Sequence, residues 1–452
     1  MTDQEICAVF NGAGDFVRRE LNCGSLTVYA YFIDGLTAGG EIAEYVFKPL
    51  YENRAEDMAV FYQQALAGAV YSATAAACTD AADAARKLVN GFCVVLFPEV
   101  GAIAYEVKTP VRRSPSPPQV ENTVKGAKDA FVESMRVNTS LLRRHLRSPD
   151  LRLWQTTVGR HTLTNVTLLY MEGLTDPTLV ERMKNRLASI ELDGFISPAA
   201  VEESITGSRA TAFPLLQYTE RTDRFCQGIL DGRVGLLVDG LPLGYLAPVD
   251  LHYLMESPED RSRDYISASA IRILRWIALL TGLLLPGLYI ALTAFHPTLI
   301  PIPLRDAVIS SRGAVPFSAA AEVLGLLIAF ELLQESGIHL PQAVGQSVSI
   351  IGGIVMGTAA VEAGLISSMA LISVSIAGIC GFVQPNRDLA TACRVWRFLI
   401  ASASAVAGLL GTAAAAGTLL IHLVRLKSMG IPYLYSKGSL VRARIKNQKE
   451  KS

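Results

Sequence analysis

The sequence has little charge and no paired cysteines. Charged residues make up 18% of the 452 residues, hydrophobic residues make up half, and the formal net charge at pH 7 is zero. So small a share of charge beside so many apolar residues is unusual for a water-soluble enzyme. The seven cysteines are scattered, with no C-x-x-C pair. This predicts reduced thiols in packed positions and not a disulfide framework.

Motifs for catalysis and for cofactors are also missing. The sequence contains no Walker A loop, no G-x-G-x-x-G segment after a strand, no nucleophile elbow and no His/Cys cluster at metal-ligand spacing. We therefore expect no enzymatic activity, no cofactor, no metal and no nucleic-acid partner. The first residues are acidic and no apolar run follows them, which predicts no secretory signal peptide and a cytoplasmic N-terminal half.

Long uncharged runs fill the second half of the chain. Each is longer than the roughly 20 residues that cross a bilayer core. Soluble helices almost always keep a polar face, so several such runs in a row predict a bundle of transmembrane helices. The runs without Asp, Glu, Lys or Arg are 276–304, 336–361, 363–386 and 398–424.

A fifth apolar segment, 313–334, is ambiguous because it contains Glu322 and Glu331. Ionised carboxylates are costly in hydrocarbon, so they face protein, water or the membrane interface. The segment is predicted either as an interfacial or re-entrant helix, or as a crossing helix whose glutamates line a hydrated path.

The topology of the bundle stays open. Arginines before the first run and the basic residues after the last run favour a cytoplasmic location for both ends. Four crossings satisfy both, but they leave Arg387, Arg394 and Arg397 outside. Five crossings bring these arginines inside and leave the C-terminal tail outside.

Small residues at four-residue spacing predict close helix packing, either within one bundle or between copies of the chain. One face consists of Gly353 and Gly357, and another of Ala407, Gly411 and Ala415.

The N-terminal half contains an internal repeat. Residues 31–37 (YFIDGLT) match residues 169–175 (LYMEGLT) at an offset of 138 residues. Both copies follow an apolar stretch and precede a helical pattern, and each part ends in a hairpin pattern. The fold class is therefore α+β, with two related α/β modules followed by an all-α transmembrane bundle. We expect a first module over 1–109, a Pro-rich linker over 110–123, a second module over 124–275, the bundle over 276–424 and a basic tail over 425–452.

The second module is expected to begin with a helix that ends in a basic cluster of Arg143, Arg144 and Arg147. Such a cluster is usually a solvated face, although it could also contact lipid phosphates or an acidic partner.

A series of short motifs runs along the chain, among them VKGAKDAFVE at 124–133, TERTD at 219–223 and MGIPYL at 429–434. Together they resemble the A-subunit family of spore germinant receptors, the GerA family, which includes the stage V sporulation protein AF. The resemblance extends from about Phe16 to Leu434. Ala127 and Thr222 stand where the family usually has proline, and Gln334 and His339 where it usually has arginine. The motif residues are Gly126, Phe131, Glu220, Arg221, Asp223, Asp239, Gly240, Pro316, Pro341 and Pro432.

This resemblance implies a membrane subunit of a nutrient receptor in the spore inner membrane, with a transporter-like B subunit and a lipoprotein C subunit as partners. It also implies a pentameric ring of copies around a channel that releases monovalent cations. The alternatives are a stage V AF-like channel that amplifies germination, a non-conducting scaffold or signalling adaptor, and a secondary transporter. The candidate ion-path residues, in and near 336–361, are Glu322, Glu331, Glu362, Ser347, Gly353 and Gly357.

Overall fold

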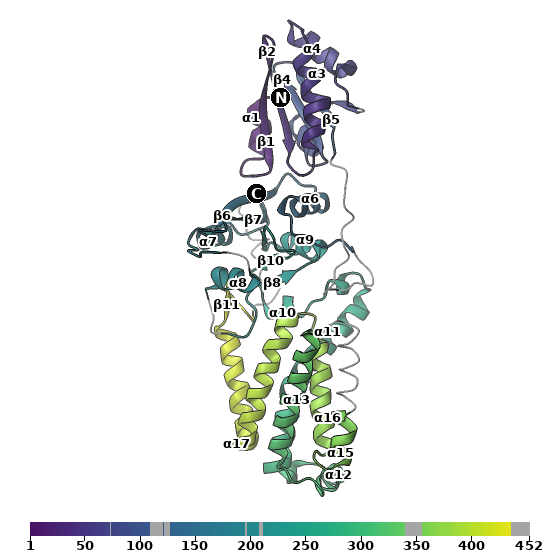
Figure 1. Ribbon diagram of the computed structural model, residues 1–452, viewed down its shortest axis with the longest axis vertical. Coiled ribbons are helices and arrows are strands. Elements are labelled where there is room, and N and C mark those ends of the chain that lie inside the picture. The colour runs from purple at the N-terminus through teal and green to yellow at the C-terminus, as the bar shows by residue number, and fades with distance from the viewer. Residues whose placement is uncertain are drawn as a thin grey trace. The chain divides into compact units, whose positions relative to one another are not determined.

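The structure is a computed structural model, and it describes residues 1–72, 74–108, 121, 127–194, 197–207, 211–339 and 355–434. The chain forms two units (Figure 1). A sheet unit comprises residues 1–209 and 215–248. A helical unit comprises residues 249–437 together with the short segment 210–214. The helical unit therefore begins at Val249, before the residue 276 at which the sequence predicted the bundle to begin.

The first module of the sheet unit is a five-stranded antiparallel sheet in the order β1-β2-β4-β5-β3. Both faces of its central strands are buried, because helices cover each of them. The elements are α1 (Asp3–Val9), β1 (Phe16–Cys23), β2 (Leu26–Ile33), α2 (Gly39–Glu41), η1 (Ile42–Phe47), α3 (Lys48–Glu52), α4 (Met58–Gln64), η2 (Ala65–Ala69), β3 (Ala75–Cys78), α5 (Ala81–Leu88), β4 (Phe92–Phe97) and β5 (Gly101–Glu106).

The second module repeats this topology, with strand order β6-β7-β9-β10-β8. The repeated sequence segments lie at equivalent places, at the ends of β2 and β7. Each module also contains a leading strand, and a further strand and helix before the hairpin, that the sequence pattern did not predict. The elements are α6 (Met135–His145), β6 (Leu151–Val158), β7 (Thr164–Met171), α7 (Pro177–Ala188), α8 (Pro198–Thr206), β8 (Gln217–Thr219), α9 (Thr222–Leu230), β9 (Val234–Val238) and β10 (Gly244–Ala247).

A buried ion pair joins the two modules. The Arg143 guanidinium donates from Nε and Nη2 to the two carboxylate oxygens of Asp15, at 2.7 and 2.8 Å. The two side chains are only 1% and 4% exposed. Beside this pair the Gly14 amide donates to the Leu153 carbonyl at 2.7 Å. The prediction that Arg143 belongs to a solvated basic face is therefore wrong, because Asp15 from the other module neutralises it.

The helical unit is built from packed helices, of which α11, α13, α16 and α17 contact one another. Ile290, Val323, Ala370 and Ala401 form part of their shared apolar core. The elements are α10 (Leu251–Leu254), η3 (Pro258–Arg261), α11 (Tyr265–Ile290), η4 (Ala291–Phe295), η5 (Pro297–Leu299), α12 (Ile302–Arg312), α13 (Ala319–His339), η6 (Val355–Ala359), α15 (Ala360–Glu362), α16 (Ser368–Phe382), α17 (Arg387–Arg425), β11 (Lys427–Ser428) and β12 (Ile431–Pro432).

The last helix, α17, is a helical hairpin (Figure 1). Its backbone leaves the helical region at Ala407 (φ −128°) and Gly408 (φ 58°, ψ −136°), and the positive φ of Gly408 favours glycine. The Ser404 and Thr412 hydroxyl oxygens lie 2.7 Å apart across the turn. The run 398–424, expected to cross a bilayer once, therefore reverses direction in its middle.

The start and the end of the helical unit lie together. The Val249 amide donates to Ser428 Oγ at 3.0 Å, and the Leu251 amide donates to the Tyr433 carbonyl at 2.9 Å. The segment after α17 thus binds the segment that leads into α10 and α11. This places the entrance and the exit of the helical unit at the same end of its bundle.

Candidate functional site

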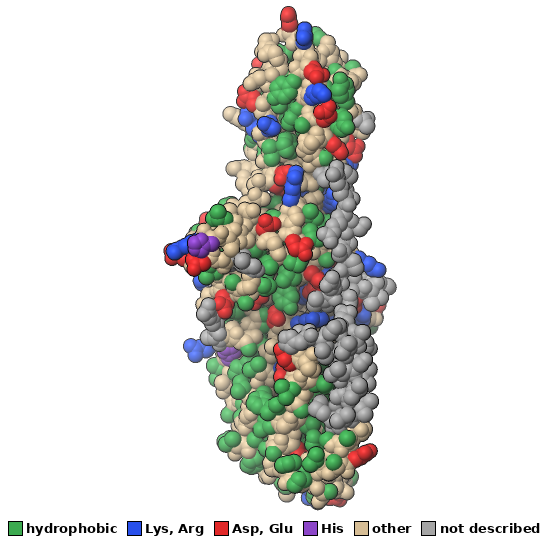
Figure 2. Space-filling model, viewed as in Figure 1, with side chains coloured by type: hydrophobic (Ala, Val, Ile, Leu, Met, Phe, Trp, Pro, Cys, Tyr) green, Lys and Arg blue, Asp and Glu red, His purple; other side chains and the backbone are tan. Residues whose placement is uncertain are grey.

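The surface of the helical unit is largely apolar, and the face visible in Figure 2 shows mainly hydrophobic side chains. Within the part of the chain that the structure describes, two helices are long and apolar enough to cross a membrane: Tyr265–Phe295, with mean hydropathy 2.0, and Arg387–Arg425, with mean hydropathy 1.8. Because the second is a hairpin, each of its legs is about 25–30 Å long at 1.5 Å per residue. That length is close to the hydrocarbon thickness of a bilayer.

The ion-path candidate Glu322 lies at the start of α13 with its side chain fully buried. Its Oε1 accepts a hydrogen bond from Arg312 Nε at 3.2 Å. Its Oε2 accepts from both the amide and the hydroxyl of Ser367, at 3.0 and 2.6 Å. Ser367 is the N-cap of α16. The carboxylate therefore links α12, α13 and the N-terminus of α16.

Glu331 differs from Glu322 in its exposure. Arg394 Nη1 of α17 lies 2.6 Å from Glu331 Oε1 and 2.5 Å from Gln334 Oε1. The Glu331 side chain is still 51% exposed, so it can interact with solvent while paired. The third candidate carboxylate, Glu362, is exposed in α15.

Four predicted site residues lie outside the described part of the chain: Gly126, Pro341, Ser347 and Gly353. Of the predicted packing face of Gly353 and Gly357, the structure describes Gly357. Gly357 is half-buried, and a Cβ on it would lie 3.8 Å from Leu371 Cδ2.

Ala407, Gly411 and Ala415 do not form one helical face. The helix breaks at Ala407, so this residue lies at the hairpin turn and the other two lie on the second leg. Gly411 instead packs against the first leg, where an added Cβ would lie 2.1 Å from the Ala403 carbonyl oxygen. The glycine is therefore required for the close approach of the two legs of α17.

Two of the motifs contact each other in the second module. The Phe131 amide donates to the Glu220 carbonyl at 2.7 Å. The Phe131 ring stacks edge-on against Phe225, with ring centroids 5.3 Å apart. Arg221 Nε and Nη2 donate to the Asp223 carboxylate at 2.9 and 2.6 Å. These motif residues therefore fix the approach to α6 against the start of α9.

The same junction contains a titratable pair. Asp129 Oδ2 lies 2.6 Å from His145 Nε2 and accepts the Thr222 hydroxyl at 2.7 Å. The hydrogen bond to Asp129 raises the pKa of His145, against the effect of burial. The hydrogen bond to His145 is also the largest reason why the pKa of Asp129 falls to about 2. Both shifts favour the charged pair.

The other described motif residues lie at turns and ends. Asp239 Oδ1 accepts the Met135 amide at 3.0 Å, and the Gly240 amide donates to the Glu133 carbonyl at 2.8 Å. The β9–β10 turn thus satisfies backbone groups at the start of α6. Pro316 is exposed before α13, and Pro432 is exposed in β12.

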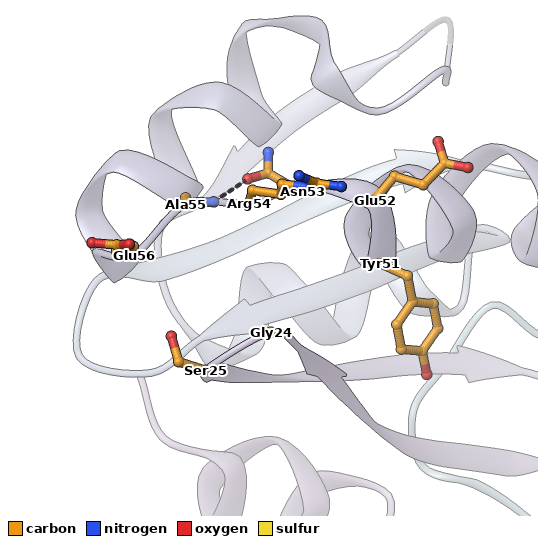
Figure 3. Close-up of a pocket in the computed structure, with 8 residues that line it drawn as sticks. All are labelled: Gly24, Ser25, Tyr51, Glu52, Asn53, Arg54, Ala55 and Glu56. Carbon is orange, nitrogen blue, oxygen red and sulfur yellow. Dashed lines mark hydrogen bonds between the residues drawn. The ribbon is translucent and has the colours of Figure 1, made fainter.

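An open cavity of about 550 Å³ lies in the first module, beside the β1–β2 turn and the segment after α3 (Figure 3). Its lining is polar and solvent-facing, and Asn53 Oδ1 accepts the Ala55 amide within it at 2.9 Å. The residues around it are Gly24, Ser25, Tyr51, Glu52, Asn53, Arg54, Ala55 and Glu56.

A family model described as "Bacillus/Clostridium GerA spore germination protein" matches residues 4–450. The chain belongs to the GerA family. The chain is 33% identical to the uncharacterized membrane protein YfkQ of Bacillus subtilis (strain 168), over 98% of this chain and 87% of that protein. Spore germination protein A1 of the same organism is 35% identical, over 80% of this chain and 77% of that protein. Spore germination protein GerLA of Bacillus cereus is 31% identical, over 95% and 88%.

This GerA-family chain is also similar to a solved structure. That structure is the N-terminal domain of the A subunit of the Bacillus megaterium spore germinant receptor GerK3, with a TM-score of 0.42 and 24% sequence identity. The alignment covers 54% of this chain and 92% of that domain. The family membership confirms the resemblance seen in the sequence motifs and makes the chain a relative of spore germination A subunits.

Sequence reasoning missed several partners in this GerA-family chain. Ser367 lies within the uncharged run 363–386, and a serine followed by a continuous apolar segment is a recognisable helix start. Arg312, close to Glu322 in an apolar segment, was a signal for a charge pair. The contact of Asp15 with Arg143 leaves no such signal, because the two residues are 128 positions apart.

Proposed function

We propose that this chain is the membrane A subunit of a spore nutrient receptor, and that several copies enclose a channel that releases monovalent cations when nutrient is sensed. Its partners in this proposal are a transporter-like B subunit and a lipoprotein C subunit in the spore inner membrane. The observation that carries the proposal is a bundle with an apolar surface and membrane-length helices in a chain of the GerA family.

The hairpin in α17 supports a topology that places the arginines at the start of α17 and the basic residues after it on one side of the membrane. With both legs crossing, Arg387 and Arg425 lie at one end of the bundle. The contacts of Val249 with Ser428 and of Leu251 with Tyr433 put the approach to α11 at that same end. The positive-inside rule then assigns this end to the cytoplasm. The conflict between four and five crossings assumed a single crossing in 398–424, and the reversal at Gly408 supports two legs there instead.

The continuity of α13 favours a crossing helix over an interfacial or re-entrant one. It is a regular helix of 21 residues, long enough for about 30 Å at 1.5 Å per residue. It packs against α11, α16 and α17. Glu331 on this helix is paired but exposed, which suits a carboxylate beside a hydrated path.

Ion flux from liposomes tests the proposal. Full-length protein, alone or with B and C subunits, would be reconstituted in vesicles loaded with K⁺, and efflux would be followed with and without nutrient. We expect efflux that requires the assembled receptor and increases with nutrient. Efflux without B and C subunits would instead support a stage V AF-like channel. No efflux under any condition, from protein that has assembled, would refute the channel and leave the scaffold.

A further inference from the structure

The carboxylate of Glu322 is satisfied entirely by protein donors. Its two oxygens accept from Arg312 Nε, the Ser367 amide and the Ser367 hydroxyl, at 2.6–3.2 Å. The side chains of Glu322 and Ser367 are both fully buried. A carboxylate that is paired with an arginine and shielded from water in this way has little capacity left to attract a passing cation.

The cluster lies at the N-terminus of α16, where the first backbone amides have no hydrogen-bond acceptor within the helix. Ser367 Oγ accepts the Ala370 amide at 3.3 Å as an N-cap. Glu322 then accepts the amide of the cap residue itself, so it acts as a second cap supplied by another helix. A negative charge is also favoured at a helix N-terminus by the aligned peptide dipoles.

Apolar packing begins directly beside the cluster. Val323 follows Glu322 on α13, Ala370 lies one turn into α16, and Ile290 lies next to Tyr289 on α11. The Tyr289 hydroxyl lies 3.5 Å from Ser367 Oγ. The polar cluster therefore closes one end of the apolar core and sets where α16 begins against α13.

We infer that Glu322 is a positioning residue, which holds the N-terminus of α16 on α13 through Ser367 with Arg312 as its counter-charge, and that it is not an ion-lining residue. The inference deepens the proposed function, because it concerns the helices that would frame the channel. Of the two ion-path candidates on α13, Glu322 is buried and Glu331 stays exposed, as does the neighbouring Glu335.

The test compares the Glu322→Gln and Glu331→Gln variants of the full-length protein in detergent. Glutamine at 322 removes the buried charge opposite Arg312, whose own side chain is partly exposed, and so breaks the ion pair. We expect the melting temperature of Glu322→Gln to fall by about 10 °C. That of the half-exposed Glu331→Gln control should change by no more than about 2 °C.

A distance measurement separates positioning from a general loss of stability. Spin labels would be introduced as noncanonical amino acids at Ile328 of α13 and Ile372 of α16, which are both about half exposed. The distance distribution between them should broaden in Glu322→Gln and remain narrow in Glu331→Gln. The double variant Arg312→Gln/Glu322→Gln should recover part of the lost stability, because it removes the unpaired guanidinium.

If Glu322→Gln does not fold, Ser367→Ala serves instead. It removes the 2.6 Å hydroxyl donor and the N-cap bond to the Ala370 amide but keeps the backbone amide that binds Glu322, so a smaller broadening is expected. Wild-type stability and a narrow distribution in the folded 322 or 367 variant would overturn the inference. None of these measurements depends on ion flux. An absence of efflux from the wild-type protein would therefore refute the channel and leave the positioning role to be decided by the labels.

Discussion

In the first module, helix α5 presents Ala84 to the sheet, and in the second module the corresponding helix α9 presents Phe225. The strand residues that face these helices differ in the opposite sense, with the larger side chain in the first module. Val94 in β4 pairs with Tyr31 of β2, and at the same place Gly235 in β9 pairs with Leu169 of β7. Where one module has a small helix residue and a larger strand residue, the other has the reverse.

The close contacts explain why a large residue on the helix requires glycine in the strands that it faces. A Cβ on Gly235 would lie 2.2 Å from Phe225 Cζ. A Cβ on Gly244 would lie 2.5 Å from Phe225 Cδ2 and 2.7 Å from Phe131 Cε2. The corresponding residue of the first module is Ala102, which is fully buried. Two modules with one topology thus fill a similar space with different side chains, because interiors must be close-packed whichever element supplies the volume.

The largest expected effect comes from the place where the two modules join. Arg143→Leu leaves the Asp15 carboxylate buried without a counter-charge, so we expect a loss of about 3–5 kcal/mol in the free energy of unfolding. Hydrogen exchange of the full-length protein would show faster exchange in residues 9–16 and in α6. The double variant Asp15→Asn/Arg143→Met should recover much of the loss. Unchanged protection in Arg143→Leu would contradict a structural role for the pair.

A second substitution tests whether the size of Phe225 on α9 is compensated by the absence of a side chain at Gly235 in β9. Gly235→Val gives β9 the residue that β4 has, and we expect overpacking against Phe225 to cost about 2–3 kcal/mol. Thermal unfolding of the full-length protein and exchange of the β9 amides would report it. The second substitution Phe225→Ala, which also copies the first module, should recover part of the loss. A double variant that is no more stable than Gly235→Val would contradict the compensation between the side chains at 225 and 235.

The smallest expected effect is a pH dependence confined to the second module. His145 faces Asp129 and Asp223, and its raised pKa means that the folded state favours the charged imidazole. The resulting stabilisation is fully present below the ordinary histidine pKa of 6.5 and disappears as pH rises through the higher folded pKa. We expect at most about 1 kcal/mol, because the His145 side chain is partly exposed and solvent screens the pair.

Hydrogen exchange of α6 and α9 between pH 6 and pH 9 would measure this dependence, with His145→Gln as the variant that should abolish it. The first module is the internal control, because its residues 1–109 contain no histidine. A pH response of equal size in both modules would show that the Asp129–His145 pair is not its source. Below pH 4 the Asp129 carboxylate adds the opposite dependence, since its pKa is lowered to about 2 and its contribution disappears on acidification.

The sequence predicted the repeat of the two modules but not all of their elements. The segments 31–37 and 169–175 identified equivalent strand ends, because a glycine turn after an apolar strand is a local signal. The short strands β3 and β8 were missed, since Ala75–Cys78 and Gln217–Thr219 are too short to show an alternating pattern. Their place in the sheets depends on pairing with β5 and β10.

The sequence by itself determined that the second half of the chain is apolar enough for a membrane, because hydrophobicity and the absence of charge are properties of composition. It did not determine where the chain reverses. The turn in α17 depends on Gly408, which packs against Phe295, and on Gly411, which packs against the backbone of Ala403. The sequence likewise placed Glu322 and Glu331 on one apolar segment. Only the tertiary packing buried Glu322 among hydrogen-bond donors and left Glu331 exposed. The physical reason is that the environment of a charge is set by the donors that folding brings around it, and Ser367 is 45 residues away along the chain.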